Sequence, residues 1–332
     1  MGFEDQYRAK NQIRVVTATS LFDGHDAAIN IMRRILQDTG AEVIHLGHNR
    51  SVAEIVNAAI EEDVQGIAVS SYQGGHMEFF KYMYDMLQEK GAGHIKIFGG
   101  GGGVIVPDEI LELHDYGITR IYSPADGSKM GLQGMINHMM QEMDFSTVDT
   151  DSLDVAGVDR QNPFTIARAI SAAEVALAEN NGQIDSLRKQ IRGKITERKI
   201  PIIGLTGTGG AGKSSLTDEL VLRLLYDNPD MHIGLLCCDP SRRKTGGALL
   251  GDRIRMNAID TPRVYLRSMA VRRTSFELPM VLPDAVDILK AANTDLILLE
   301  TAGIGQGASN VFDLTDVSVY VMTSDYGAST QL

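Results

Sequence analysis

The chain has 332 residues, of which 43% are hydrophobic and 22% charged, and its formal net charge at pH 7 is −12. This length suffices for two domains with separate hydrophobic cores, and the acidic balance argues against a protein that coats nucleic acid through its overall field. The N-terminus is polar and no apolar run approaches the roughly 20 residues of a membrane helix, so we expect neither a targeting segment nor a membrane anchor.

Residues 13–142 alternate short apolar runs with segments of helical periodicity. This alternation is typical of a parallel sheet covered by helices. One of the expected helices begins with Ser51 and Glu54, which form a capping-box pattern. The expected strands are the apolar runs 13–19, 42–46, 66–70, 94–98 and 119–122. The sequence therefore predicts an α/β domain of flavodoxin-like (Rossmann-like) type over residues 1–145.

Three of the expected strands end in loops of unusual composition. Asp23 and His25 follow the first strand, a polar loop from Ser70 to His76 follows the third, and the glycine run 99–103 follows the fourth. In such a sheet a ligand binds beyond the carboxyl ends of the strands, at the switch point between the first and the third. A histidine there can ligate a metal through one ring nitrogen while an aspartate holds the other N–H, and glycines let a large group or a long tail approach the backbone. We therefore expect one binding crevice at these loops.

The order of these residues resembles the cobalamin-binding domain of adenosylcobalamin-dependent mutases, whose motif is D-x-H-x-x-G, then S-x-L, then G-G. The corresponding residues here are Asp23, His25, Ala28, Ser70, Tyr72, Gly99 and Gly100. The resemblance implies that His25 replaces the cofactor's own base as lower ligand of cobalt, with Asp23 as its hydrogen-bond partner. It also implies that Ser70 meets the displaced nucleotide tail and that the two glycines let this tail pass. Tyrosine in place of leucine at 72 changes the wall of the tail pocket, whereas alanine in place of glycine at 28 adds only a methyl group.

Three further histidines, His45, His48 and His76, lie near the same strand ends and could line the crevice. Loop histidines are usually hydrogen-bonded surface groups. We therefore do not assign them as ligands.

A solvated segment and a helical region follow the first domain. Residues 144–162 are rich in Asp, Ser and Thr, Asn162-Pro163 provides an N-cap and a first-turn proline, and apolar residues then recur at helical spacing up to Ile195. The run 180–182, Asn-Asn-Gly, interrupts this pattern, so one long helix and two shorter ones both remain open. We expect residues 146–198 to form a helical linker whose apolar stripe packs on a neighbouring domain or a partner helix.

A glycine-rich stretch follows the apolar run 201–206. Residues 207–214 match G-x-x-x-x-G-K-[ST], in which backbone N–H groups cradle phosphates, the lysine contacts the β- and γ-phosphates and the hydroxyl binds Mg²⁺. The same residues contain G-x-G-x-x-G, with Asp239 where a dinucleotide site keeps its ribose-binding acid, but Lys213 and Ser214 decide for the P-loop. The expected nucleotide-binding residues are Gly207, Gly209, Gly210, Ala211, Gly212, Lys213, Ser214 and Ser215.

Two acidic residues end later buried runs of this second domain, which we place at residues 199–332. Asp239 follows the run 232–238 and Glu300 follows the run 295–299. In a P-loop fold, acids at such strand ends contact Mg²⁺ through water and sense the γ-phosphate. We therefore expect a magnesium site at Ser214, Asp239 and Glu300, and we expect Lys213 and Glu300 to act in nucleotide hydrolysis.

A basic segment and a cysteine pair lie in the same domain. Cys237 and Cys238 are adjacent in an apolar run and cannot form an ordinary disulfide across the fold, so we expect core residues in a reducing, cytoplasmic compartment. For the basic residues, a solvated face and a contact to phosphate or a partner both remain open, and no arginine finger is assigned. These residues are Arg242, Arg243, Lys244, Arg253, Arg255, Arg263, Arg267, Arg272 and Arg273.

The P-loop and the strings 239–241, 245–247, 251–256 and 300–306 resemble the GTPases that act as chaperones for cobalamin-dependent mutases. The resemblance implies GTP as substrate, with Asp239 in the first switch and Glu300 in the second. The guanine-reading motif N-K-x-D of GTPases is missing before Leu332. We therefore expect an incomplete GTPase domain in the N-terminal portion of a longer protein.

A cobalamin domain followed by such a GTPase resembles the fused isobutyryl-CoA mutases. The resemblance implies adenosylcobalamin and Mg²⁺ as cofactors, cobalamin and GTP or GDP as ligands, and an acyl-CoA bound by a mutase domain beyond this chain. The complete enzyme, expected to be a homo-oligomer, would interconvert isobutyryl-CoA and butyryl-CoA by radical rearrangement, with GTP hydrolysis gating cofactor loading. Two alternatives remain open: a cobalamin carrier without mutase activity of its own, and a P-loop ATPase or kinase with an unrelated flavodoxin-like domain.

Overall fold

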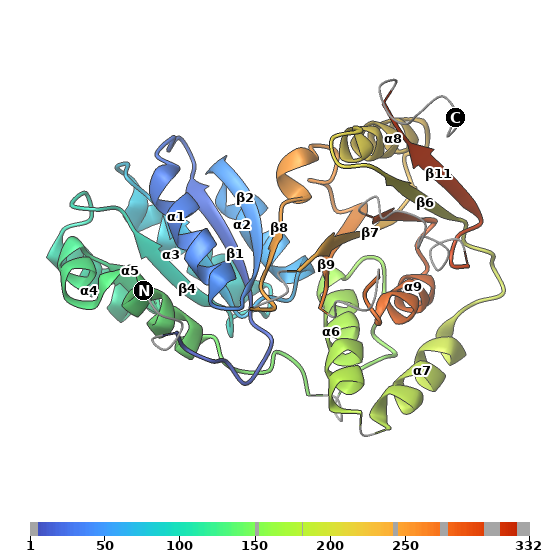
Figure 1. Ribbon diagram of the computed structural model, residues 1–332, viewed down its shortest axis with the longest axis horizontal. Helices are drawn as coiled ribbons and strands as arrows, with labels where there is room; N and C mark the ends of the chain where they lie inside the picture. The colour runs from blue at the N-terminus through green and yellow to red at the C-terminus, as the bar shows by residue number, and fades with distance from the viewer. Residues whose placement is uncertain are drawn as a thin grey trace. The chain divides into compact units, whose positions relative to one another are not determined.

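The computed structural model describes residues 6–149, 153–180, 182–241, 245–272, 278–301 and 313–323 (Figure 1). The chain forms two compact units, one of residues 1–149 and 241–254 and the other of residues 150–240 and 255–332. Each unit contains a parallel sheet with helices packed on it, as the alternation of apolar runs and helical periodicity predicts. The expected switch residues 302–306 and the basic residues Arg242, Arg243, Lys244 and Arg273 lie outside the described residues.

The first unit is built on a six-stranded sheet with parallel neighbours in the order β5-β4-β3-β1-β2-β8. Its strands are β1 (Arg14–Ser20), β2 (Glu42–Arg50), β3 (Gly66–Ser70), β4 (Lys96–Gly100), β5 (Arg120–Tyr122) and β8 (Ala248–Leu250). Its helices are α1 (Ala27–Asp38), α2 (Val52–Glu61), α3 (His76–Glu89), α4 (Pro107–Tyr116) and α5 (Pro124–Glu142). The order of β1 to β5 is that of a flavodoxin-like domain, which confirms the predicted fold class and puts β1 and β3 side by side at the switch point.

The local sequence explains the elements that carry this unit's loops. β1 is buried along its whole length. Its sequence is largely apolar and β-branched, which is typical of a strand that is covered on both faces. The predicted capping box at the start of α2 is present: the Ser51 hydroxyl accepts the Glu54 backbone N–H, and the Glu54 carboxylate accepts the Ser51 N–H at 2.8 Å. Both features fix the strand ends from which the loops depart.

Strand β4 is displaced from its predicted position. The apolar run 94–98 suggested the strand, but β4 begins at Lys96 and continues through Gly99 and Gly100, which pair with β5. Glycine has a low strand propensity, so the sequence pattern ended the strand two residues early. The shift places both glycines on the sheet itself rather than in the loop beyond it.

Strand β8 was not predicted from the sequence. Ala248–Leu250 pairs with residues 42–44 of β2. A Cβ on Gly247 would lie 2.0 Å from the carbonyl oxygen of Gln37, so glycine is required where the segment meets the sheet. A three-residue strand offers no periodicity for a sequence prediction to detect.

The second unit is built on a five-stranded sheet with parallel neighbours in the order β11-β6-β10-β7-β9. Its strands are β6 (Ile202–Gly207), β7 (Ile233–Pro240), β9 (Val264–Val271), β10 (Leu296–Thr301) and β11 (Val317–Val321). Its helices are α6 (Pro163–Glu179), α7 (Gln183–Lys194), α8 (Lys213–Asp227) and α9 (Leu282–Ala291). Strand β6, the glycine-rich loop and α8 follow one another directly, which is the context that a P-loop needs.

The helical region between the two predicted domains forms two helices rather than one. The break falls at Asn180 and Gly182, whose φ angles are positive at 50° and 83°. Both helices pack on α9, and Arg188 of α7 bonds Asp284 of α9 at 2.7 Å. The apolar stripe of α6 is therefore buried within the second unit.

Cys237 and Cys238 are buried in β7, as predicted for core residues. None of the described helices combines the length and the apolar character needed to cross a membrane.

Candidate functional site

The loop after β1 holds His25 in a fixed orientation against Asp23. One oxygen of Asp23, Oδ1, accepts both the backbone N–H and the ring Nδ1–H of His25, each at 2.8 Å. The other oxygen, Oδ2, accepts the backbone N–H of Tyr72 at 2.5 Å, so Asp23 also ties the loop after β3 to the loop after β1. The His25 side chain is 74% exposed while that of Asp23 is fully buried. With Nδ1 engaged, Nε2 is the nitrogen that can ligate a metal.

Asp23 is charged at neutral pH in this setting. Burial alone would raise the pKa of its carboxyl group, but the N–H groups of Tyr72 and His25 hold that pKa below its ordinary value. A buried carboxylate that accepts several N–H groups fixes the tautomer of the histidine with Nδ1 protonated.

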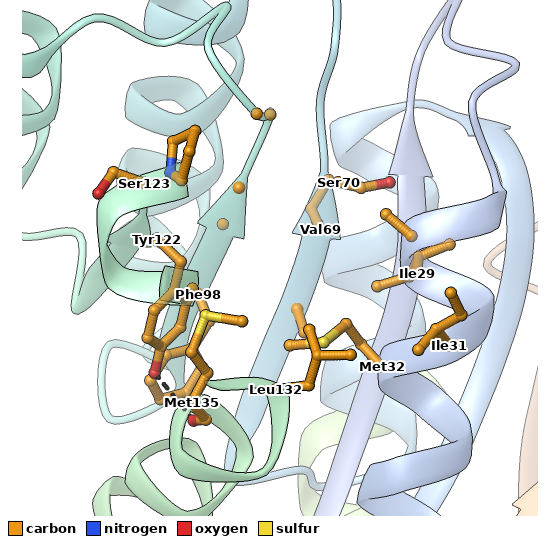
Figure 2. Close-up of a pocket in the computed structure, with 18 of the residues that line it drawn as sticks. Ile29, Ile31, Met32, Val69, Ser70, Phe98, Tyr122, Ser123, Leu132 and Met135 are labelled. Atoms are coloured by element: carbon orange, nitrogen blue, oxygen red, sulfur yellow. Dashed lines mark hydrogen bonds between the residues drawn. The ribbon is translucent and has the colours of Figure 1, made fainter. Parts of the chain in front are cut away.

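Next to these loops lies a cavity of about 360 Å³, which Figure 2 shows in close-up. Residues of α1 form one wall, and residues of β4, β5 and α5 form the other. The lining residues are Ala28, Ile29, Ile31, Met32, Ala68, Val69, Ser70, Tyr72, Phe98, Gly99, Gly100, Gly101, Gly102, Tyr122, Ser123, Pro124, Gly127, Leu132, Met135 and Met139. The predicted residues Ser70, Tyr72, Gly99 and Gly100 are among them, and so is Ala28. The lining is mostly apolar, which suits an aromatic group that carries a polar tail.

Glycines in the β4 strand and loop are required by the protein itself. A Cβ on Gly99 would lie 2.4 Å from the Phe80 ring, and a Cβ on Gly101 would lie 1.9 Å from the carbonyl oxygen of Ser71. The loop therefore lies directly on the chain that follows β3. This packing gives a physical reason for the glycine run besides the passage of a ligand.

Sequence reasoning missed the apolar wall of the cavity. Met32, Phe98, Tyr122 and Leu132 come from four different elements, and in the sequence each is an ordinary apolar or aromatic residue of a helix or strand. What these residues share is that they lie on neighbouring strands and on the helices beside those strands. The sequence shows this only once the order of the strands in the sheet is known.

The three histidines not assigned as ligands are placed differently from one another. His45 is buried in β2 and bonds the Thr17 hydroxyl at 2.9 Å, whereas His48 is exposed. His76 is buried between the carbonyl oxygen of Gln73 at 3.1 Å and Glu109 at 2.9 Å. None of the three lines the cavity.

The P-loop of the second unit has the backbone that its glycines predict. Gly207, Gly210 and Gly212 have φ angles of 146°, 80° and 91°, which favour glycine. The Lys213 ammonium donates to the carbonyl oxygens of Gly207 and Thr208 at 2.8 and 3.0 Å. The lysine is thus folded over the loop, with its charge where phosphate groups are bound.

The hydroxyl predicted to bind Mg²⁺ lies against the acid of β10. Ser214 Oγ donates to Glu300 Oε1 at 2.6 Å, and Thr217, one turn further along α8, donates to Glu300 Oε2 at 2.9 Å. Glu300 itself is buried. The structure therefore brings the serine of the P-loop and the glutamate of β10 together.

Asp239, the penultimate residue of β7, lies beside the same group of charges. Burial raises the pKa of its carboxyl group; Arg255 opposes the shift, Glu300 adds to it, and Lys213 opposes it. A set of hydroxyl and carboxylate oxygens suits Mg²⁺, a hard cation that prefers oxygen ligands. Ser214, Asp239 and Glu300 therefore fit a magnesium ion bound with nucleotide phosphates.

Comparison with known proteins assigns the two parts of the chain that contain these sites to families. Residues 166–332 match the family of the methylmalonyl-CoA mutase-associated GTPase MeaB. The chain belongs to the MeaB family. In this MeaB-family chain, residues 13–133 also match the B12 binding domain. The cavity beside His25 thus lies in a B12 binding domain, which decides against an unrelated flavodoxin-like domain.

Relatives of the MeaB-family chain confirm its resemblance to the fused mutases. It is 61% identical over 328 residues to the fused isobutyryl-CoA mutase of Geobacillus kaustophilus, covering 98% of this chain and 30% of that protein. It is 56% identical over 329 residues to the enzyme of the same name from Cupriavidus metallidurans, covering 97% and 29%. The small subunit of 2-hydroxyisobutanoyl-CoA mutase from Aquincola tertiaricarbonis is 39% identical over 97 residues, which are 29% of this chain and 69% of that subunit. The chain spans about 30% of the length of the fused relatives.

Proposed function

We propose that the first unit binds adenosylcobalamin with His25 Nε2 as the lower ligand of cobalt and with the nucleotide tail in the 360 Å³ cavity. The observation that carries this proposal is the double hydrogen bond from His25 to the buried Asp23, since it leaves an exposed imidazole with a fixed free nitrogen at the carboxyl end of β1. When bound, the cofactor supplies radical chemistry. The chain's own part is to hold and orient it.

We propose for the second unit that it binds GTP with Mg²⁺ and hydrolyses it. The ammonium of Lys213 and the backbone N–H groups of the P-loop would hold the phosphates, while Ser214, Asp239 and Glu300 would hold the magnesium ion. The contact between Ser214 and Glu300 supports this arrangement, because the serine hydroxyl and the buried carboxylate already lie within hydrogen-bonding distance of each other.

The complete protein, in this proposal, interconverts isobutyryl-CoA and butyryl-CoA, and GTP hydrolysis gates the loading of its cofactor. The support is the name of the fused relatives and the match to a mutase-associated GTPase. The acyl-CoA would bind to a part of the protein outside the given residues. We further propose a cytoplasmic homo-oligomer, in keeping with two buried, adjacent cysteines.

The absorption spectrum of bound cobalamin tests the cofactor site. The His25→Ala variant should lose the spectrum of a histidine-ligated, base-off cobalamin, whereas His48→Ala, at an exposed histidine near the end of β2, should keep it. An unchanged spectrum in His25→Ala would defeat the ligand assignment. For the nucleotide site, Lys213→Ala should abolish GTP turnover, and undiminished turnover would defeat that assignment.

A further inference from the structure

Arg255 touches the hydroxyl that the proposed magnesium ion needs. Its Nε donates to Ser214 Oγ at 3.1 Å, while the same hydroxyl donates its hydrogen to Glu300 at 2.6 Å. A serine hydroxyl has one hydrogen and two lone pairs. The hydroxyl hydrogen of Ser214 is therefore donated to Glu300, and the positively charged Arg255 donates to a lone pair of the same oxygen.

The position of Arg255 is set by α8 itself. Asp218, one helical turn after Ser214, accepts the backbone N–H groups of Asn257 and Ala258 at 2.8 and 2.7 Å. Met256 is buried in the hydrophobic core of the unit. The three residues that follow Arg255 are thus fixed, and they hold its exposed guanidinium at the start of α8.

A magnesium ion and the guanidinium of Arg255 cannot share the hydroxyl of Ser214. Mg²⁺ binds an oxygen at about 2.1 Å in near-octahedral geometry, and two cations on one oxygen repel each other strongly at this distance. Burial raises the pKa of Asp239, the other acid of the group, and the charge of Arg255 opposes this rise. In the structure described here, Arg255 therefore supplies the positive charge that Mg²⁺ would supply to the two acids.

We propose that Arg255 holds the place of the divalent cation until the nucleotide arrives, and then moves to the nucleotide's phosphates. Once Mg²⁺ neutralises Asp239 and Glu300, the phosphates held by the P-loop are the nearest remaining anions. A guanidinium has five N–H donors in a planar fork, which suits phosphate oxygens. The inference rests on the proposed nucleotide site and names a further catalytic residue for it.

The test measures how much Mg²⁺ the purified protein needs to bind a fluorescent GDP analogue, mant-GDP. Arg255→Gln removes the competing charge, so half-maximal binding should need a several-fold lower Mg²⁺ concentration than in wild type. The same variant loses a phosphate contact, so GTP turnover should fall roughly tenfold or more. These opposite changes distinguish displacement of Arg255 from general damage, which would weaken both.

Two further variants make the result specific. Arg255→Lys keeps the charge but not the fork, so its Mg²⁺ requirement should stay near wild type while turnover falls. Arg223→Gln changes an exposed arginine of α8 that pairs with Glu219, and it should match wild type in both measurements. An unchanged Mg²⁺ requirement in Arg255→Gln would overturn the inference while leaving the nucleotide site intact. A wild-type protein that binds no mant-GDP would overturn the site and the inference together.

Discussion

Asp23 Oδ1 accepts two hydrogen bonds from His25, one from its backbone N–H and one from its ring Nδ1–H, each 2.8 Å long. Both hydrogen bonds of the pair therefore form within a segment of three residues, 23–25. The aspartate acts on the metal site through the histidine, as a positioning residue.

Changing Asp23 to Asn should weaken cobalamin binding by roughly 10- to 100-fold, because an amide does not hold the Nδ1–H tautomer as a carboxylate does. The matched control is Asp26→Asn, an exposed residue of the same loop whose side chain makes no capping bond to α1. Titration of the apoprotein with cobalamin measures both affinities. Equal affinities in the two variants would contradict the role of Asp23.

Adding one methyl group at Gly101, in the glycine run after β4, should disrupt the packing of this loop on the chain after β3. Gly101→Ala places a Cβ 1.9 Å from the backbone oxygen of Ser71, so we expect a loss of roughly 1–3 kcal/mol in the free energy of unfolding. Gly103→Ala, two residues on, meets nothing within 4 Å and should change stability little. Urea unfolding followed by circular dichroism measures the difference, and equal midpoints would show that the loop yields freely.

Burial makes the first unit sensitive to acid through His45. Burial, with the charge of Arg33, lowers the pKa of His45 from 6.5 to about 4. Between these two pH values the unfolded chain binds a proton that the folded chain does not bind. Stability should therefore be complete above pH 6.5 and fall as the pH approaches 4, by up to roughly 3 kcal/mol.

The variants His45→Gln and His48→Gln separate this effect from general acid sensitivity. His45→Gln should lose the part of the pH dependence that lies between pH 6.5 and 4, whereas His48→Gln, changed at an exposed residue of β2, should keep it. Urea midpoints across this pH range give the comparison. Parallel curves for wild type and His45→Gln would remove His45 as the cause.

Glu62 links two buried arginines of the first unit. Its carboxylate accepts Arg14 Nη2 at 2.5 Å and Arg253 Nε at 2.9 Å, and all three side chains are buried. Arg14 keeps Glu42 and Arg253 keeps Glu61 as partners, but Glu62→Gln sets an amide N–H₂ donor against one of the two guanidinium donors, so it should cost about 3 kcal/mol of stability. The control Glu112→Gln breaks a surface pair with Lys81 and should cost less than about 1 kcal/mol. Similar losses in thermal unfolding would show that the buried pair contributes no more than a surface pair.

The sequence predicted those features that depend on short local patterns. The P-loop follows from eight consecutive residues, and the strand that precedes Asp23 and the strand that ends at Ser70 follow from apolar runs bounded by polar loops. The convergence of the loops after β1 and β3 also follows, since the order of parallel strands brings their carboxyl ends together. The hydrogen bond from the Tyr72 N–H to Asp23 was not predicted.

Features that depend on distant residues could not be predicted in this way. Strand β8 has three residues and pairs with a strand about 200 positions earlier in the chain, as the register of Ala248 with Glu42 shows. Phe98 and Leu132 line one cavity only because β4 and α5 fold side by side. Arg255 stands among many basic residues, and only the bonds of Asp218 show which one reaches Ser214.

The central claim is that His25, rather than the cofactor's own base, ligates cobalt. Protein grown with ¹⁵N-histidine and loaded with cob(II)alamin tests it by electron paramagnetic resonance, because the axial nitrogen splits each cobalt line. We predict that labelling converts the ¹⁴N triplet into a ¹⁵N doublet in wild type and in His48→Ala, and that His25→Ala lacks the doublet. A triplet that persists in labelled wild-type protein would mean that the cofactor's base remains on cobalt, which would contradict the account.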